Sequence, residues 1–397
     1  MKEVKKFSFL FLCILMLFLV ACDKDSIEKP TVQPTAQPTL APTQEPLKES
    51  EGLEMYLDKH KGYYVKGIGT CTDTVIVIPN EYNGEPIVGI HYGAFRDNKN
   101  ITKVVMNNTI DEIRSNAFSR CENLEEVILN DSLTTLGGDT FSYCTSLKEI
   151  KIGDNVKIIN LNDFNSCSSL EKVTLGKSVK IIGNNAFSGC KIKEIHFPAS
   201  LEKIDKSFWT TYLEKITIDP ENETYTVREN CLMQGDTLIL SNINGTIPEG
   251  TTAIGDSAFW NNTTITQIVV PEGVTSIGVG SFAFCSNLSD ISLPQSLTLI
   301  DQIAFTGCEK LTTIILPKTV EIKRMLFDGC KNLTHIYYEG NSEDWYNVSP
   351  AQSIASQKVT FCIYAETEAE MYLTDTTLPN VEWMFWRYVD GEPKIYT

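Results

Sequence analysis

The chain has 397 residues, a formal net charge of −17 and 42% hydrophobic residues. Apart from lysines near its start it contains no basic tract, which argues against nucleic acid or an anionic lipid surface as its partner. The length alone would allow two or more ordinary domains, but internal repeats override that estimate.

The first 21 residues are predicted to be a signal peptide. Three lysines lie within the first six residues, and the apolar run from 7 to 20 is short for a membrane span. The run ends in Leu19-Val20-Ala21-Cys22, which resembles the lipobox of bacterial lipoproteins. That resemblance implies cleavage before Cys22, diacylation of its thiol and attachment of residues 22 onwards to the membrane. The alternative is an ordinary signal peptide with a chance cysteine, or an uncleaved anchor.

Residues 22–50 are predicted to form the lipidated cysteine and an extended linker. Proline recurs every four residues in this stretch, at Pro30, Pro34, Pro38, Pro42 and Pro46. Proline at this density favours polyproline II and forbids a helix or a packed strand. At ~3.1 Å per residue, the linker would hold the following part up to roughly 80–90 Å from a bilayer. Residues 51–100 are then expected to form a lead-in and an N-terminal cap.

From residue 101 to residue 340 the chain repeats itself about every 23 residues. A phenylalanine marks the units, at Phe95, Phe118, Phe141, Phe164, Phe187, Phe208, Phe259, Phe282, Phe305 and Phe327. A cysteine follows three residues after most of these, at Cys121, Cys144, Cys167, Cys190, Cys285, Cys308 and Cys330. Apolar positions locked to a period of ~20–29 residues mean that each unit forms the same coil, so the pattern predicts a leucine-rich repeat solenoid.

Each unit reads L-x-x-I-x-L, then a polar turn, then V-x-x-I-G-x-x-A-F-x-x-C. The opening half alternates apolar and polar residues, which predicts a strand, whereas A-F-x-x-C predicts a single helical or 3₁₀ turn. Glycine at the corner suits a close approach or a positive φ, at Gly137, Gly183, Gly255 and Gly278. Thr140 and Asp163 replace the alanine before Phe. The fold is therefore predicted to be a mainly β repeat solenoid with one strand and one such turn per coil. An irregular interlude is expected at 213–264 and a C-terminal cap at 341–397.

The A-F-x-x-C-x-x-L unit resembles that of the BspA-like, Treponema-type class of leucine-rich repeat proteins on bacterial surfaces. The segments 62–84, 225–259 and 337–340 are similar to those that this class places before, within and after its repeats. The resemblance implies a solenoid displayed on the extracellular face of the bacterial cell membrane. Some members are adhesins for host matrix and plasma proteins, which implies a binding function.

Ten cysteines follow Cys22, and seven of them occupy one repeat column. The column needs a small buried apolar group and its members stack in parallel, so we expect free structural thiols. A disulfide among Cys71, Cys231 and Cys362 stays open. No C-x-x-C or H-E-x-x-H motif occurs and the four histidines lie at unrelated positions, so no catalytic residue, metal or cofactor is expected.

Two sets of residues are candidates for binding. The outward strand column includes the apolar residues Val105, Ile128, Val269, Ile315 and Tyr337. Exposed apolar patches mark interaction sites, although strand propensity alone also explains Val and Ile. Trp209 and Trp260 follow the repeat phenylalanine where other units place serine or asparagine. They are candidates to stack on a sugar or to anchor a protein, or they only cover the interlude.

We therefore expect a non-catalytic, lipid-anchored surface protein that binds other macromolecules. The expected partners are host proteins or proteins of neighbouring cells, bound in the manner of an adhesin. The alternative is binding to glycans or to the cell envelope through exposed Trp and Tyr near the interlude and the C-terminal cap.

Overall fold

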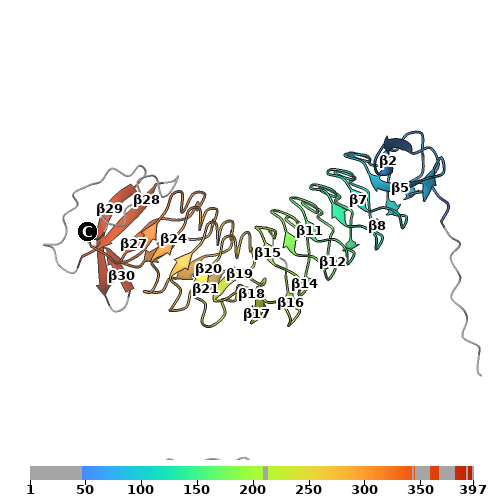
Figure 1. Cartoon of the computed structure of the whole chain (residues 1–397). Coiled ribbons are helices and arrows are strands. Elements are labelled where there is room, and N and C mark those ends of the chain that lie inside the picture. The colour runs from blue at the N-terminus through green and yellow to red at the C-terminus, as the bar shows by residue number, and fades with distance from the viewer. Residues whose placement is uncertain are drawn as a thin grey trace, which may run out of the picture. The chain divides into compact units, whose positions relative to one another are not determined.

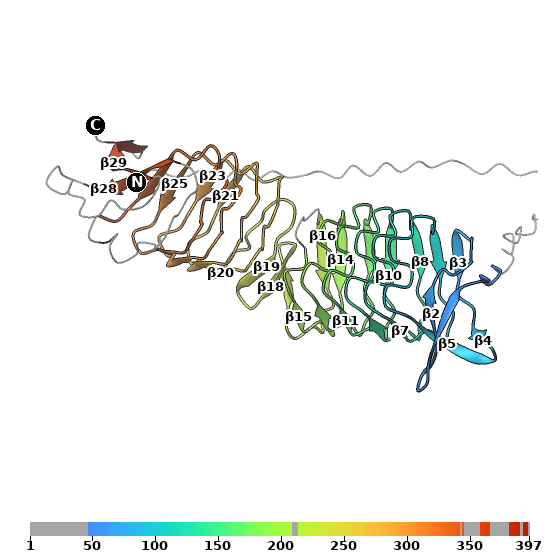
Figure 2. The same ribbon diagram turned by 90° about the horizontal axis from the view of Figure 1, so that it is seen from above.

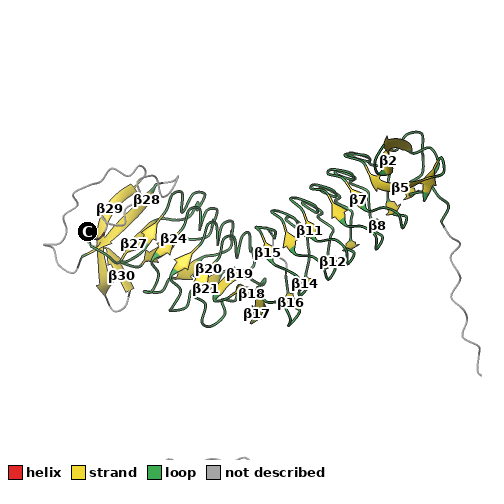
Figure 3. Ribbon diagram, in the orientation of Figure 1, coloured by secondary structure: helices red, strands yellow, loops and turns green. Residues whose placement is uncertain are grey.

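Each repeat forms one coil of a β-solenoid in the computed structural model (Figure 1), as the periodicity predicts. The structure describes residues 47–208, 213–341, 344, 358–365, 381–389 and 392–395. The predicted signal peptide and Cys22 lie outside these residues, as does nearly all of the proline-rich linker. Figure 3 shows that strands and turns make up the described coils.

The first strand of each coil builds one side of the solenoid as parallel sheets. In the first half these strands are β3 (Val75–Val77), β6 (Lys103–Val105), β8 (Glu126–Ile128), β10 (Glu149–Lys151), β12 (Lys172–Thr174), β14 (Glu194–Phe197) and β16 (Lys215–Ile218). They pair in register, so that Val104 lies beside Val127 and Ile150 beside Val173. The register follows from the alternating pattern, since a slip by one residue would turn every buried side chain to solvent.

A second, shorter strand in each coil was not predicted from the sequence. In the first half these two-residue strands are β7 (Glu112–Ile113), β9 (Thr135–Leu136), β11 (Ile158–Ile159), β13 (Ile181–Ile182) and β15 (Lys203–Ile204), and the longer β5 (Glu85–Ile90) of the lead-in pairs with β7. Two residues are too few to show an alternating pattern in the sequence. The corner glycines that follow serve close approach, because a Cβ at Gly137 would lie 2.3 Å from the Ser115 backbone nitrogen.

The A-F-x-x-C segment forms a run of turns on the third side of the coil. The amide of Cys121 donates to the carbonyl of Phe118 at 3.2 Å, which is the i→i+3 bond of the expected turn. The run does not continue as a helix, because Asn116 and Arg120 adopt φ of 62° and 63°. Alternate amides instead donate to carbonyls of the next coil, as the amide of Phe118 does to the carbonyl of Thr140 at 2.9 Å. All three sides of the solenoid therefore carry hydrogen bonds between coils.

The repeat phenylalanines stack in the core. Ring centroids from Phe95 to Phe187 follow one another at 5.1, 5.3, 5.5 and 5.4 Å, with nearly parallel planes. The column cysteines lie beside them, buried and free. Each thiol donates to the phenylalanine carbonyl of the preceding coil, as Cys144 does to Phe118 at 3.2 Å. The expected column of structural thiols is confirmed, and Cys71, Cys231 and Cys362 are also free.

The interlude inserts an antiparallel meander into the parallel solenoid. Strands β17 (Thr226–Arg228), β18 (Cys231–Gln234) and β19 (Thr237–Leu240) pair antiparallel in sequence. Strand β19 then pairs in parallel with β20 (Ala253–Ile254), where regular coils resume. The coils of the second half contain β21 (Gln267–Val269), β22 (Ser276–Ile277), β23 (Asp290–Ser292), β24 (Leu299–Ile300), β25 (Thr313–Leu316), β26 (Glu321–Ile322) and β27 (His335–Tyr338).

Both ends of the described solenoid are covered. At the N-terminal end, the amide of Ser50 donates to the carbonyl of Val77 and the hydroxyl of Ser50 accepts from the amide of Val77. These bonds occupy the open edge of β3. The hairpin of β1 (Glu54–Asp58) and β2 (Gly62–Gly67) pairs with β5, against which β4 (Glu81–Tyr82) also lies. At the other end the sheet of β25 and β27 continues into β28 (Val359–Tyr364), β29 (Val381–Val389) and β30 (Glu392–Ile395).

Asp163 should make the solenoid less stable as the pH rises. Its carboxylate is fully buried and accepts hydrogen bonds from the amides of Asn160 and Thr140 at 2.6 and 3.3 Å. Burial nevertheless raises its pKa to about 8 from 3.8. The neutral carboxyl therefore stabilises the fold below pH about 3.8, and this contribution is lost as the pH rises through about 8.

We predict that the melting temperature of Asp163→Ala, which restores the usual repeat residue, increases relative to that of the parent as the pH rises from 4 to 8. The difference in the free energy of unfolding between variant and parent should change by up to about 1.4 kcal/mol per pH unit. Thermal unfolding followed by circular dichroism measures this difference. Ser281→Ala, at the same repeat position before Phe282, is the matched control and should show a constant offset, because the buried Ser281 hydroxyl bonds only to the carbonyls of Gly255 and Gly278. A constant offset for Asp163→Ala as well would contradict the assignment.

Burial should also make the column thiols unreactive. It raises the pKa of Cys121 and of Cys285 to about 12, so little thiolate exists near neutral pH. Ellman's reagent should titrate ten thiols in denaturant for the chain from residue 23 onwards, and in the native state should react first with Cys71, which is only half-buried. Fewer than ten thiols in denaturant without reductant would show disulfides and refute the free column.

Candidate binding surfaces

The outward side chains of the first strands form one continuous surface in the first half, here called the strand face. It takes the first and third residues of β6, β8, β10, β12, β14 and β16. Figure 2 shows the first strands of these coils following one another along the solenoid. Ile128 is 42% exposed on this face, while Val105 in the preceding coil is half-buried. Both residues therefore lie on the side that the sequence pattern predicts, and Ile128 is the more accessible of the two.

Ion pairs neutralise one edge of the strand face. The first residues of the strands are three lysines and three glutamates that pair between coils, Lys103 with Glu126 at 2.8 Å, Glu149 with Lys172 at 3.2 Å and Glu194 with Lys215 at 3.7 Å. Exposed pairs of this kind contribute little stability. Their effect here is to remove net charge from the edge, so the third residues of the strands decide what the face can bind.

A hollow of about 530 Å³ lies over β8, β10 and β12 of the strand face. Ile128, Lys151 and Thr174 line it, with Met106 and Asp131 at its border. Lys151 forms no ion pair within the part of the chain that the structure describes. The hollow thus combines an exposed aliphatic side chain with an available ammonium group.

The second half of the outward column departs from the prediction. Val269 is 72% exposed, but Ile315 is half-buried and Tyr337 is only 8% exposed. The ring of Trp386, from the C-terminal cap, lies 5.0 Å from the Tyr337 ring, and Ile315 packs against the same cluster. Tyr337 was therefore wrongly placed on an exposed face, because β28 and β29 extend the sheet and cover it.

The two candidate tryptophans follow the phenylalanines Phe208 and Phe259. Trp209 lies outside the described residues. Trp260 is half-buried and its ring lies 5.0 Å from that of Phe284 in the next coil. A Cβ at Gly280 would approach the Trp260 ring to 2.7 Å, so the ring rests on glycine backbone. Trp260 therefore packs against the following coil.

His196 on β14 forms a hydrogen-bonded chain that the sequence does not reveal. Its Nδ1 lies 3.0 Å from Thr217 Oγ1 and its Nε2 lies 3.0 Å from Asp219 Oδ1. The residues come together because β14 and β16 pair in register, with His196 beside Thr217. The imidazole is exposed to water at the surface, so this arrangement orients a side chain of the strand face and encloses no reaction site. Among the described residues, no group of three or more metal-ligating side chains could hold an ion.

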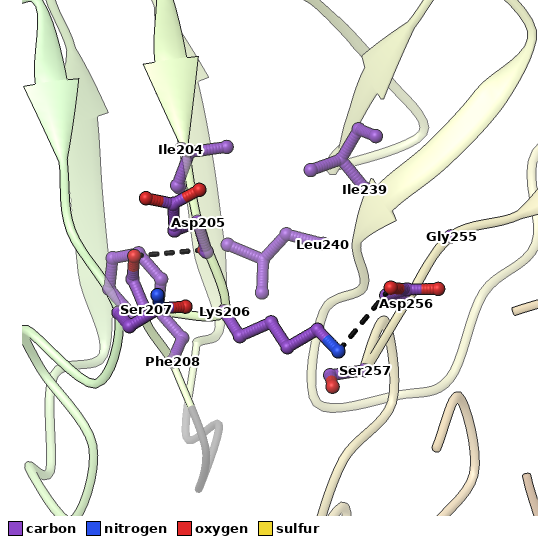
Figure 4. A pocket seen from close by; sticks show the side chains of 11 residues that line it. Ile204, Asp205, Lys206, Ser207, Phe208, Ile239, Leu240, Gly255, Asp256 and Ser257 are labelled. Carbon is purple, nitrogen blue, oxygen red and sulfur yellow. Dashed lines mark hydrogen bonds and ion pairs between the residues drawn. The ribbon is translucent and has the colours of Figure 1, made fainter. Parts of the chain in front are cut away.

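A crevice of about 240 Å³ lies where the interlude interrupts the stacked phenylalanines (Figure 4). Phe208 and Leu240 line it, and the Lys206 side chain crosses it to form an ion pair with Asp256 at 3.3 Å. The hydroxyl of Ser257 faces this region without a partner in the described structure. The only sign in the sequence is that the unit at 192–212 is two residues short and lacks the column cysteine.

The sequence model for the BspA type Leucine rich repeat region (6 copies) matches residues 88–214 and 226–353, which is more than half of the chain. The chain belongs to this family. No curated protein matches the sequence. The structural comparison adds two bacterial proteins with the same kind of fold.

The pneumococcal vaccine antigen PcpA is 21% identical, with a TM-score of 0.63 over 78% of this chain and 83% of that one. A leucine rich cell surface protein of Faecalibacterium prausnitzii A2-165 is 25% identical, with a TM-score of 0.55 over 77% of this chain and 98% of that one. Both likenesses show the fold of this chain. In the described part of the chain, no helix has the length and apolarity needed to span a membrane.

Proposed function

We propose that this chain is a lipid-anchored protein on the extracellular face of a bacterial cell membrane that binds another protein through its strand face. The observation that carries the proposal is the exposed Ile128 beside Lys151 in the hollow over β8, β10 and β12. Membership of a surface-protein repeat family supports a binding role. We infer no chemical reaction for the solenoid.

The chemistry of the strand face favours a protein as the ligand. The charged edge is neutralised by pairs between coils, so the face lacks the single-sign field that attracts a charged polymer. An exposed aliphatic residue is suited to contact an apolar side chain at the centre of an interface. Lys151 beside it favours a partner with an acidic group at that position. Glycans, the alternative ligands, would depend more on the rings of Trp260 and its neighbours.

The strand face gains specificity from its fixed geometry. Its side chains stand on two parallel sheets, β3-β6-β8 and β10-β12-β14-β16, within which the strands pair in register, so the spacing of the side chains within each sheet is set before a partner binds. A preformed surface binds more tightly than a mobile one, because less conformational entropy is lost on association. The His196 side chain, held by Thr217 and Asp219, extends this ordered surface over β14.

The anchor can be tested separately from the binding face. We predict that the chain produced in a bacterium with lipoprotein processing lacks residues 1–21 and carries acyl chains on Cys22. Intact-mass and peptide mass spectrometry measure both features, and Cys22→Ser should leave the protein soluble and without acyl chains. An unmodified Cys22 in the membrane fraction would contradict the proposed anchor.

Charge and size changes on the strand face should weaken protein binding. The mature chain with Cys22→Ser is presented to immobilised matrix and plasma proteins and to a panel of polysaccharides, with surface plasmon resonance as the readout. For a protein that binds saturably, we predict that Ile128→Asp and Lys151→Glu each raise the Kd at least about tenfold, or about 1.4 kcal/mol.

The matched control is Ile158→Asp, which makes the same change at an exposed position on the second strand ladder. It should leave the Kd unchanged. Equal losses in all three variants, or saturable binding only to polysaccharides with loss in Trp260→Ala, would reject the strand face and favour the glycan alternative.

A further inference from the structure

A row of four apolar side chains lies on the turn side of the second half, well away from the strand face. The row consists of Trp260, Phe284, Ile303 and Met325, and we call it the apolar row. Phe284 is 42% and Met325 50% exposed, while Trp260 and Ile303 are half-buried. The Cβ position of Gly280 lies 2.7 Å from the Trp260 ring and 3.6 Å from Ile303 Cδ1, so these side chains are neighbours across one glycine.

Three members of the apolar row adopt a left-handed backbone. Their φ values are 61° at Phe284, 55° at Ile303 and 56° at Met325. Asn, Asp and Gly tolerate this region, whereas bulky and β-branched residues are disfavoured there. At the repeat positions equivalent to Ile303 and Met325, the first half places Gly93, Asn116, Asp139, Asn162 and Asn185. Backbone strain retained in adjacent coils is a mark of functional surfaces.

Opposite charges stand at the two ends of the apolar row. Three of the four residues that lie three before a repeat phenylalanine in these coils are polar, Asp256 in the first coil, Gln302 in the third and Arg324 in the last, while the second coil has Val279. All three are exposed. Arg324 forms no ion pair within the described residues, whereas Asp256 contacts Lys206 at 3.3 Å. The row therefore has the carboxylate of Asp256, shared with Lys206, beside its two rings and the guanidinium of Arg324 beside its two aliphatic side chains.

We propose that two copies of this chain pair through the apolar row about a two-fold axis, with their solenoids antiparallel. This arrangement places Trp260 against the partner's Met325 and Phe284 against the partner's Ile303, so that each ring meets an aliphatic side chain. It also brings Asp256 opposite the partner's Arg324, and the symmetry gives that contact twice. Trp, Phe, Met and Arg are enriched at protein interfaces. The row is short, so the pairing is weak and reversible.

Sedimentation velocity over a range of concentrations tests the pairing with the full mature chain carrying Cys22→Ser. The parent protein should shift from monomer to dimer as its concentration rises. Phe284→Asn combined with Met325→Asn should raise the dimer Kd at least about tenfold. Asparagine suits a positive φ, so this variant keeps its fold and its melting temperature should not fall. Arg324→Glu should also weaken the dimer, whereas Arg324→Lys should not.

The matched control is Tyr143→Asn. Tyr143 is 48% exposed with φ of 60° and holds the repeat position of Phe284 in the first half. It should leave the dimer unchanged. A parent chain that stays monomeric at all concentrations, an unaffected dimer in the double variant, or equal weakening by Tyr143→Asn would each overturn the proposal. Quenching of Trp fluorescence in a monomeric parent by soluble polysaccharide would assign the row to glycans instead.

Discussion

Hydrogen bonding between successive coils, in register on all three sides, is the constraint on which the rest of this solenoid depends. The first strands pair residue for residue within each sheet, and the two-residue strands do the same. The turn side adds bonds such as that from Phe118 to Thr140, and it continues with the bond from Phe141 to Asp163 where both strand ladders are interrupted, between β8 and β10 and between β9 and β11. Coils fixed in this way leave the core side chains little conformational freedom. The phenylalanine rings therefore stack at 5.1 to 5.5 Å in the first half, slightly more than the ~4.8 Å spacing of strands.

The same constraint explains why sequence changes appear as surface rows. Because each repeat position occupies one column, a residue type that recurs or changes between coils marks a line along the solenoid. The strand face follows such lines in the first half, and the apolar row combines neighbouring positions of the turn side in the second half. The interlude separates the halves, since its antiparallel strands interrupt the stacked phenylalanines between Phe208 and Phe259. Each half can therefore carry its own contact surface on one continuous scaffold.

Much of the coil could be predicted from the sequence because its apolar positions recur. The phenylalanine and cysteine columns, the outward place of Ile128 and the family all follow from the period. The two-residue strands could not be recognised, since Ile158-Ile159 shows no alternation. The burial of Tyr337 was missed because Trp386 covers it from a segment without repeats. The left-handed backbone at Ile303 was missed because its residue type argues against that conformation.

Native-state hydrogen exchange measured by mass spectrometry or NMR tests the central constraint most directly. The account predicts that amides of the turn side which bond to the next coil, such as those of Phe118 and Phe141, exchange as slowly as amides of β8 and β10. Exchange of these turn amides at the rate of an unstructured peptide, with the strands still protected, would contradict it. The turn side would then be a loose connection and could not hold the phenylalanine column or the apolar row in place.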